Sequence, residues 1–191
     1  MPDVQALLAD LISGEDARAE LAASGLAQCG QPAVSLLLAL LDSPNEDTRW
    51  WASRALAAQA GRDAALGLIR SLEDPAASVR QCAALGLRLH PSCEAMTALL
   101  QALADPDRLV ARLAADALAA LGTQATPGVM AALASERAEI RIEAARCLAL
   151  IRDPASIPAL YNSLDDPSAI VHYWAEQALE RLGEGMVFFK P

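Results

Sequence analysis

The chain has 191 residues, of which 54% are hydrophobic and only 4% aromatic, and its formal net charge is −9. Nucleic-acid phosphates bind basic surfaces, so an acidic chain of this kind is not expected to bind nucleic acid. No run of 18 or more apolar residues occurs, so no membrane span is expected. Alanine and leucine dominate the apolar content, and both are strong helix formers, which predicts an all-α protein.

The N-terminal segment MPDVQALLADL has no basic residues and two aspartates, unlike a signal peptide. Four cysteines, Cys29, Cys82, Cys93 and Cys147, are widely spaced, and the HPSC segment at residues 90–93 is too short a pattern to predict a zinc site. We expect reduced thiols in a cytoplasmic protein, with no metal and no other cofactor. Cys82 and Cys147 are predicted to pack as small core residues.

An internal repeat of about 31 residues runs along the chain. Its equivalent reference positions, 30 or 31 residues apart, are Gly14, Pro44, Pro75, Pro106, Glu136 and Pro167. In all six copies a leucine stands three positions before the reference, an alanine eight after it and a leucine twelve after it. The pattern predicts six units, which occupy roughly residues 3–30, 31–61, 62–91, 92–122, 123–153 and 154–183.

Each unit is predicted to contain two helices. In the second unit, Val34, Leu37, Leu38 and Leu41 follow helical spacing. This first helix is expected to end before Pro44, because proline disfavours helix in the preceding residue and cannot extend one. The second helix is predicted to bury positions 4, 7, 8, 11 and 12 after the reference, the stripe of an amphipathic helix. Small residues at position 11 allow neighbouring helices to approach closely, and larger ones would overpack the interface.

One such helix pair cannot bury its own apolar face, whereas six stacked pairs share a continuous core. The segments DPAASVRQCAALGL (residues 74–87) and DPSAIVHYWAEQALERLG (166–183) resemble HEAT repeats. They are most similar to the short repeats of phycobilisome-lyase-type proteins, with a V-R-x-x-A-A-x-A-L-G pattern. The resemblance covers residues 3–184 and implies a right-handed α-α superhelix. We therefore expect a single solenoid over residues 1–184 and a C-terminal tail over 185–191.

Two aromatic pairs occupy the same place in their units. TRWWASRAL puts Trp50 beside Trp51, and VHYWAEQAL puts Tyr173 beside Trp174. Adjacent helical residues point about 100° apart, so only one of each pair belongs to the buried stripe. Trp51 and Trp174 are inside it and are predicted to pack in the core or between repeats. Trp50 and Tyr173 are at position 6, outside it. They are candidates for partner binding, and the alternative is that they only cover neighbouring helices near the two ends.

The resemblance implies that the second helices line the concave surface, and positions 6 and 10 of these helices therefore define a candidate groove. We expect the groove to bind an extended peptide or a protein surface rather than one small molecule, because successive helices lie about 8–10 Å apart. The candidate partner-binding residues are Trp50, Arg54, Gln81, Arg112, Ile142, Arg146 and Tyr173.

Position 5 of the second helices carries Arg49, Arg80, Arg141 and His172. These side chains are predicted to stabilise the turns, by bonding aspartates or carbonyl groups of their own or the next unit. An anion-binding ladder is the alternative interpretation.

No catalytic pattern is evident in the sequence. The two histidines, His90 and His172, fall in different units without a nucleophile–base arrangement. The deoxyhypusine hydroxylases, an enzyme family that shares this architecture, use His-Glu pairs to bind iron, and here His90 precedes Pro91 and His172 precedes Tyr173. We expect a non-catalytic scaffold or adaptor that binds a protein or peptide, with neither nucleic acid nor membrane as partner. Two alternatives are a subunit of a bilin lyase or bilin-handling chaperone, which the resemblance implies, and a structural accessory protein that assembles through its ends.

The segment GEGMVFFKP, residues 183–191, contains both phenylalanines of the chain. We expect it to fold back and seal the last repeat, as terminal repeats must cover an exposed core. Its alternative role is a docking motif for a partner or for a second copy of the chain.

Overall fold

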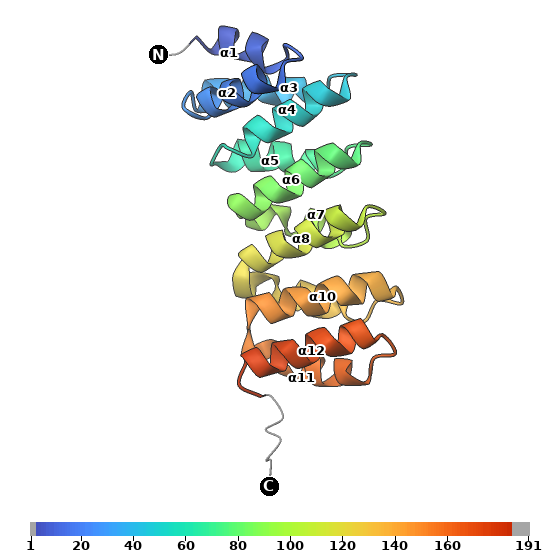
Figure 1. Cartoon of the computed structure of the whole chain (residues 1–191). Coiled ribbons are helices and arrows are strands. Elements are labelled where there is room, and N and C mark those ends of the chain that lie inside the picture. Colours follow the sequence, from blue (N-terminus) through green and yellow to red (C-terminus); the bar gives the residue numbers. More distant parts are fainter. Residues whose placement is uncertain (1–2, 185–191) are drawn as a thin grey trace. The chain divides into compact units, whose positions relative to one another are not determined.

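The computed structural model describes residues 3–184, which are helical without any β-strand (Figure 1). The predicted tail at 185–191 lies outside the described residues. The described chain divides into two compact parts, residues 3–98 and 99–184, with the division inside helix α7 (Met96–Ala102). These parts are named the first and the second unit, and each contains several of the predicted helix-pair repeats. No helix within residues 3–184 has both the length and the apolar character needed to span a bilayer.

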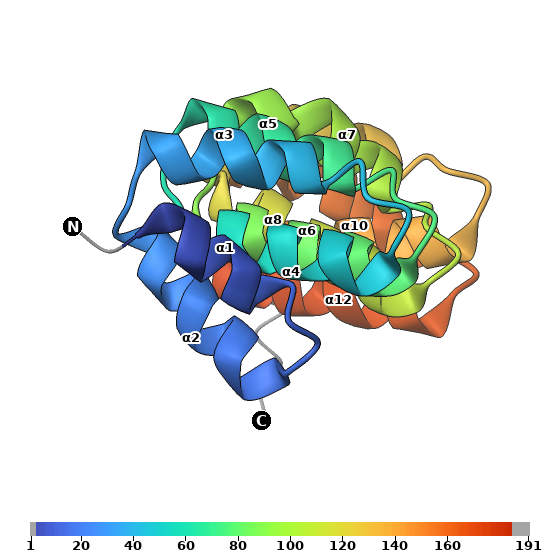
Figure 2. The ribbon, with the colours of Figure 1, turned by 90° about the horizontal axis from the view of Figure 1, so that it is seen from above.

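The first unit contains three helix pairs and the start of a fourth. Its helices are α1 (Val4–Leu11), α2 (Asp16–Ala27), α3 (Gln31–Leu40), α4 (Glu46–Leu56), α5 (Arg62–Ser71) and α6 (Ala77–Leu89), followed by the 3₁₀ turn η1 (Cys93–Ala95) and α7 (Met96–Ala102). In this unit α3 and α5 pack side by side in one layer, and α4 and α6 in the other (Figure 2). The helices α2 and α4 are also neighbours.

The second unit repeats the same plan. After the end of α7 it contains α8 (Arg108–Ala120), η2 (Gly122–Ala125), α9 (Thr126–Ala132), α10 (Ala138–Ile151), η3 (Pro154–Ser156), α11 (Ile157–Asn162), η4 (Ser163–Asp165) and α12 (Ala169–Arg181). Here α8 packs against α10, and α10 against α12, so the second helices again form one layer. The first helices of this unit begin with a short 3₁₀ turn, which the sequence pattern did not predict.

The repeat pattern predicts the core of both units correctly. Each of the six predicted repeats contains one helix pair, and each second helix begins two residues after its reference position. The alanine at position 8 and the leucine at position 12 are buried in all six repeats. The leucine three positions before the reference is buried in four repeats, whereas Leu133 and Leu164 are half-buried. The recurring alanine and leucine positions are therefore the ones that pack between the helices. The predicted all-α fold is confirmed.

Close approach at position 11 is visible at Gly86 in α6. A Cβ atom added at Gly86 would lie 2.7 Å from the Cβ of Ala57 and 3.1 Å from its Cα. Because Ala57 ends α4, this glycine allows α6 to pack against the end of the preceding second helix. The prediction that small residues at this position permit helix contact is confirmed here.

Candidate functional site

Helix α4 presents the first aromatic pair. Asn45 caps the helix by accepting a hydrogen bond from the Thr48 backbone N–H at 3.1 Å, and Glu46 and Asp47 occupy its first turn. Carboxylates are favourable there because the helix dipole is positive at its N-terminus. One turn later the rings of Trp50 and Trp51 meet edge to face, with centroids 4.7 Å apart and an interplanar angle of 85°.

Trp50 and Trp51 line a hollow of about 660 Å³, which we name the Trp50 hollow. Its other walls come from the α1–α2 turn, the start of α2 and the start of α4. Leu11 and Ile12 contribute apolar surface, and the acidic side chains in its lining are Asp16, Glu20 and Asp47. Trp51 is half-buried between repeats, which is one of the two places predicted for it, and it remains open to this hollow.

The remaining candidates of the first unit lie on α4 and α6. Arg54 is about one-third exposed and binds Glu20 of the preceding repeat at 2.5 Å. Gln81 is half-buried on α6. Thus Trp50 and Arg54 flank Glu20 on the second-helix layer.

The second unit contains Arg112, Ile142, Arg146 and Tyr173. Arg112 is exposed on α8, and Ile142 is half-buried on α10, where it lines a second hollow of about 360 Å³. Tyr173 on α12 is 51% exposed and meets Trp174 edge to face, with centroids 5.3 Å apart and an interplanar angle of 71°. Trp174, like Trp51, is half-buried rather than fully enclosed in the core.

Arg146 differs from the other candidates because it is buried. Its guanidinium donates hydrogen bonds to Glu143 at 2.8 Å, to Asp116 at 2.7 Å and to the Arg112 carbonyl at 2.8 Å. The side chain is only 8% exposed. We therefore correct the expectation that Arg146 belongs to a partner-binding surface: its donors are already used to join α10 to α8.

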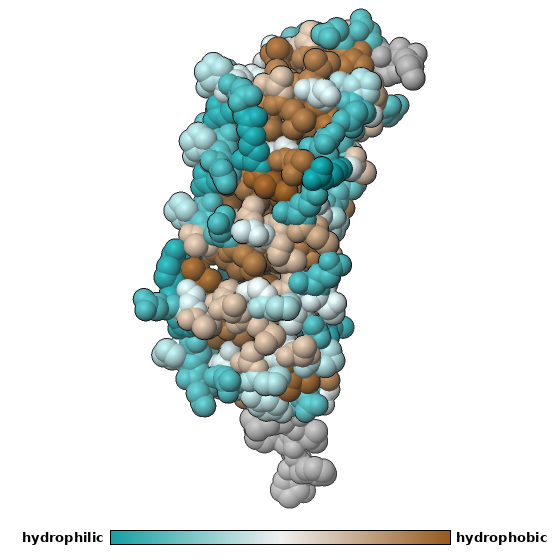
Figure 3. All heavy atoms as spheres, turned by 180° about the vertical axis from the view of Figure 1, so that it is seen from behind, coloured by the Kyte–Doolittle hydropathy of each residue, from teal (hydrophilic) through white to brown (hydrophobic). Residues whose placement is uncertain are grey.

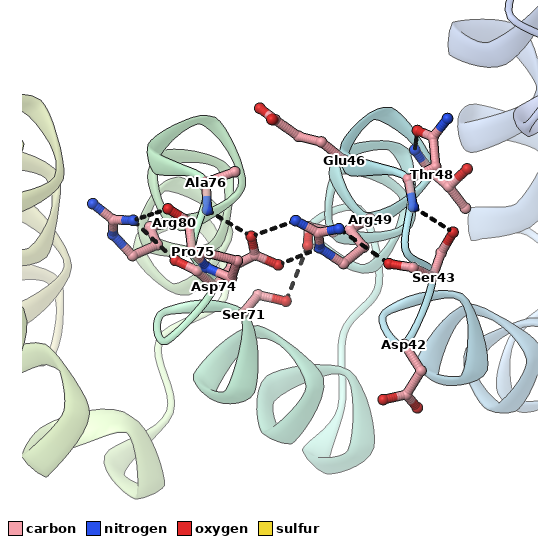
Figure 4. A network of polar contacts seen from close by, with 12 residues as sticks. Asp42, Ser43, Glu46, Thr48, Arg49, Ser71, Asp74, Pro75, Ala76 and Arg80 are labelled. Carbon is pink, nitrogen blue, oxygen red and sulfur yellow. Dashed lines mark hydrogen bonds and ion pairs between the residues drawn. The ribbon is translucent and has the colours of Figure 1, made fainter.

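The position-5 side chains stabilise the turns, as predicted. Arg49 makes a bidentate ion pair with Asp74 of the next repeat, at 2.7 and 3.0 Å, and also donates to the Ser43 carbonyl of its own turn at 3.0 Å (Figure 4). Arg80 repeats part of this arrangement, because it donates to the Asp74 and Pro75 carbonyls of its own turn.

The same ion pair recurs in the second unit. Arg141 binds Asp166 at 2.7 and 3.0 Å and donates to the Ser135 carbonyl at 2.9 Å. His172 contacts the Leu164 carbonyl through Nδ1 at 2.6 Å and Glu176 through Nε2 at 3.0 Å. We name Arg49–Asp74 and Arg141–Asp166 the inter-repeat ion pairs.

These contacts shift the pKa values of the side chains that make them, in each case toward the charged form. The hydrogen bond from Arg141 is the main reason that the pKa of Asp166 lies below its ordinary value. Burial alone would raise the pKa of Asp74, but the hydrogen bonds from Arg49 and from the Ala76 backbone outweigh it and lower the pKa. The Leu164 carbonyl, followed by Glu176, raises the pKa of His172. Both aspartates are therefore held as carboxylates by the packing of adjacent repeats.

The two buried cysteines, Cys82 and Cys147, are not reactive thiols at neutral pH. Burial raises the pKa of the Cys82 thiol to about 11 and that of Cys147 to about 12, so both stay protonated near neutral pH. Both are buried core residues, as predicted. Within residues 3–184, no group of three or more His, Cys, Asp or Glu side chains is arranged to hold a metal ion.

The acidic lining of the Trp50 hollow was missed by sequence reasoning. Asp16 and Asp47 are both in the first turn of a second helix, one repeat apart. Their places near the starts of two successive second helices, two and three residues after the reference positions, were visible in the sequence, but the proximity of the α1–α2 turn to α4 was not. The first helices of both units also have exposed apolar side chains, including Leu66 in the first unit and Tyr161 in the second. Figure 3 shows apolar patches bordered by polar residues in the view from behind.

Comparison with known proteins agrees with this architecture. A family model for HEAT repeats matches residues 96–180, and a search of curated proteins finds no matching sequence. The complex of CpcE and CpcF of phycocyanin lyase from Nostoc sp. PCC7120 is 26% identical, with a TM-score of 0.61 over 75% of this chain and 96% of that chain.

Two engineered proteins are also similar in structure. One is 25% identical, with a TM-score of 0.54 over 97% of this chain and 98% of that chain. The other, a designed armadillo repeat protein in complex with the peptide (KR)4, is 19% identical, with a TM-score of 0.55 over 94% of this chain and 99% of that chain. The helix pairs at a period of about 31 residues and these structural neighbours show an all-α superhelical repeat fold, and within it residues 96–180 match HEAT repeats.

Proposed function

We propose that this protein is a non-catalytic scaffold that binds a protein or an extended peptide through its second helices. The observation that carries the proposal is the pair of aromatic sites, Trp50–Trp51 and Tyr173–Trp174, which keep ring surface accessible at the same position of their repeats. Half-exposed aromatic side chains next to polar groups are typical of the residues that dominate protein–protein binding energy.

Six side chains are proposed to contact the partner, and each unit contributes a separate set of three. In the first unit these are Trp50, Arg54 and Gln81, and in the second unit Arg112, Ile142 and Tyr173. Arg146 is left out because its guanidinium is occupied internally. The likeness to a complex of two lyase subunits supports a protein partner, because it shows one protein of this fold in association with another.

Selection from a phage library of random nine-residue peptides, against the full chain, tests the proposal. We expect enriched peptides whose affinity, measured by fluorescence anisotropy, falls about tenfold or more in Trp50→Ala or Tyr173→Ala, the usual size of a hot-spot loss. The matched control is Tyr161→Ala, which removes an exposed tyrosine from the first helix of the same repeat as Tyr173. Peptides that depend only on Tyr161 would assign binding to the first-helix layer and overturn the proposal.

A second candidate function is the handling of a bilin, which the likeness to a phycocyanin lyase complex favours. Exposed Arg112 would pair with a propionate, and Tyr173 would stack on a pyrrole ring. A red shift and sharpening of bilin absorbance on mixing with the protein, lost in Tyr173→Ala, is the expected result. An unchanged spectrum at saturating protein would exclude this candidate.

Assembly through the chain ends is a third candidate and concerns the tail at 185–191. Light scattering of the full chain beside a chain ending at residue 184 tests it. A mass that rises with concentration only in the full chain would support tail-mediated self-association.

A further inference from the structure

We propose that the Trp50 hollow binds a cationic side chain of the partner, preferably an arginine. This inference rests on the proposed scaffold function and names the chemistry of the group that this surface recognises. It follows from the combination of aromatic walls and unneutralised carboxylates in one hollow.

The aromatic walls are suited to a cation. Trp50 and Trp51 meet edge to face, so they present two ring surfaces about perpendicular to each other. A tryptophan face attracts a guanidinium or ammonium group more strongly than any other side-chain ring does. Both tryptophans are half-buried and line the hollow, so part of each ring surface is open to a ligand there.

The charge of the hollow also favours a cation. Of its three acids, Glu20 is already paired with Arg54, whereas Asp16 and Asp47 form no ion pair within the described part of the chain. The neighbouring cations are engaged elsewhere, since Arg49 binds Asp74 and Arg18 binds Asp10 and Glu15.

The helix dipoles reduce this negative charge but do not cancel it. Asp16 and Asp47 lie in the first turns of α2 and α4, and each helix N-terminus contributes about half a positive charge. Two carboxylates against two half charges leave about one negative charge beside the indoles. A single cationic side chain would balance that charge.

Arginine fits better than lysine. Its planar guanidinium can stack on one indole while donating to a carboxylate in the ring plane, which the compact ammonium of lysine cannot do. The hollow of about 660 Å³ is within the size range of pockets that accept small organic groups. The net charge of −9 adds long-range attraction for basic partners.

The peptide selection described above also tests this inference. Peptides whose binding depends on Trp50 are expected to carry arginine or lysine at one fixed place. Replacing that arginine by citrulline, which keeps the shape but removes the charge, is expected to weaken binding about tenfold. The double variant Asp16→Asn/Asp47→Asn is expected to lose the same amount of affinity for the arginine peptide. Replacing the peptide's arginine by citrulline should then weaken binding to this variant little further, because the protein change and the peptide change remove the same interaction.

A matched control variant is Glu73→Gln, which removes one carboxylate from an exposed turn of the same unit. It should leave binding within about twofold, because Glu73 does not line the hollow and salt screens the attraction between separate exposed charges. A loss equal to that of the aspartate variants would mean that only net charge matters, and would overturn a specific site.

The two proposals fail in different ways. Trp50-dependent peptides that carry no basic residue, or that tolerate citrulline or norleucine in place of arginine, would overturn the cationic inference and leave the scaffold function standing. If no enriched peptide depended on either Trp50 or Tyr173, the scaffold function itself would be wrong.

Discussion

Arg54 and Arg146 occupy the same position of their repeats, one in each unit, and have opposite surroundings. Arg54 is about one-third exposed and has one acidic partner, Glu20. Arg146 is buried and has three acceptors on α10 and α8. The helix and the register are equivalent in the two cases, so neither explains the difference.

The neighbouring repeat positions explain it. Position 7 is Glu143 beside Arg146 but Trp51 beside Arg54, and position 10 of the preceding repeat is Asp116 in one case and Ser24 in the other. Two acids draw Arg146 inward and satisfy it there, whereas a tryptophan and a serine offer Arg54 no such site. At this position the arginine of the second unit stabilises the fold internally, whereas the arginine of the first unit stays partly open to solvent. The repeat register thus fixes the direction of a side chain, while its neighbours decide its role.

The largest expected effect tests this contrast directly. Arg146→Ala should lower the free energy of unfolding by about 3 kcal/mol, because it leaves Glu143 and Asp116 partly buried without a cation. Arg54→Ala should cost less than about 1 kcal/mol, since it breaks an exposed ion pair. Urea unfolding followed by far-UV circular dichroism measures both. Equal losses would show that the two arginines have the same structural role.

A second prediction compares two glycines at position 11. Gly86→Ala should destabilise the protein by about 2 kcal/mol, because the new methyl group would meet the backbone of Ala57, which cannot move aside. Gly25→Ala meets only the side-chain tip of Leu7, at 3.0 Å, and alanine favours helix, so its net effect should be close to zero. The thermal midpoint of each variant is the measurement. A well-tolerated Gly86→Ala would mean that the packing of α6 against the end of α4 is looser than described.

The sequence predicted what every repeat shares. Alanine at position 8 and leucine at position 12 are buried throughout, because the same inter-helix contact recurs every 31 residues. The structural role of Arg49 and Arg141 was also predictable, since an aspartate follows 25 residues later in each case. The repeat pattern predicts the role of a side chain where the residues that surround it also recur from repeat to repeat.

The sequence could not predict what departs from the repeat. The burial of Arg146 depends on Glu143 and Asp116, and no other repeat has an acidic residue at either of these two positions. The acidic lining of the Trp50 hollow depends on how the α1–α2 turn lies against α4. Neither arrangement leaves a recognisable motif in the sequence, because each is formed by residues of two adjacent repeats whose sequences differ from the other repeats at these positions.

Substitutions in the inter-repeat ion pairs are expected to have the smallest effect on stability. Unlike Arg54 and Arg146, these pairs have the same geometry in both units. Asp74→Asn and Asp166→Asn should each cost about 1 kcal/mol at neutral pH, since the amide keeps the bond from the Ala76 or Ser168 backbone but no longer accepts two bonds from the guanidinium as a carboxylate.

The pH dependence of this loss has a definite sign. The pKa of each aspartate is lower in the folded protein, so its contribution is present above the ordinary value near 3.9 and disappears as the pH falls through the lowered value. Urea midpoints of wild type and variant should therefore differ at pH 7 and converge toward pH 3, by the same amount for Asp74 and Asp166. A difference that stayed constant in acid would mean that the lost free energy comes from packing rather than from charge. Unequal losses at the two sites would show that the units differ in these pairs as they do at Arg54 and Arg146.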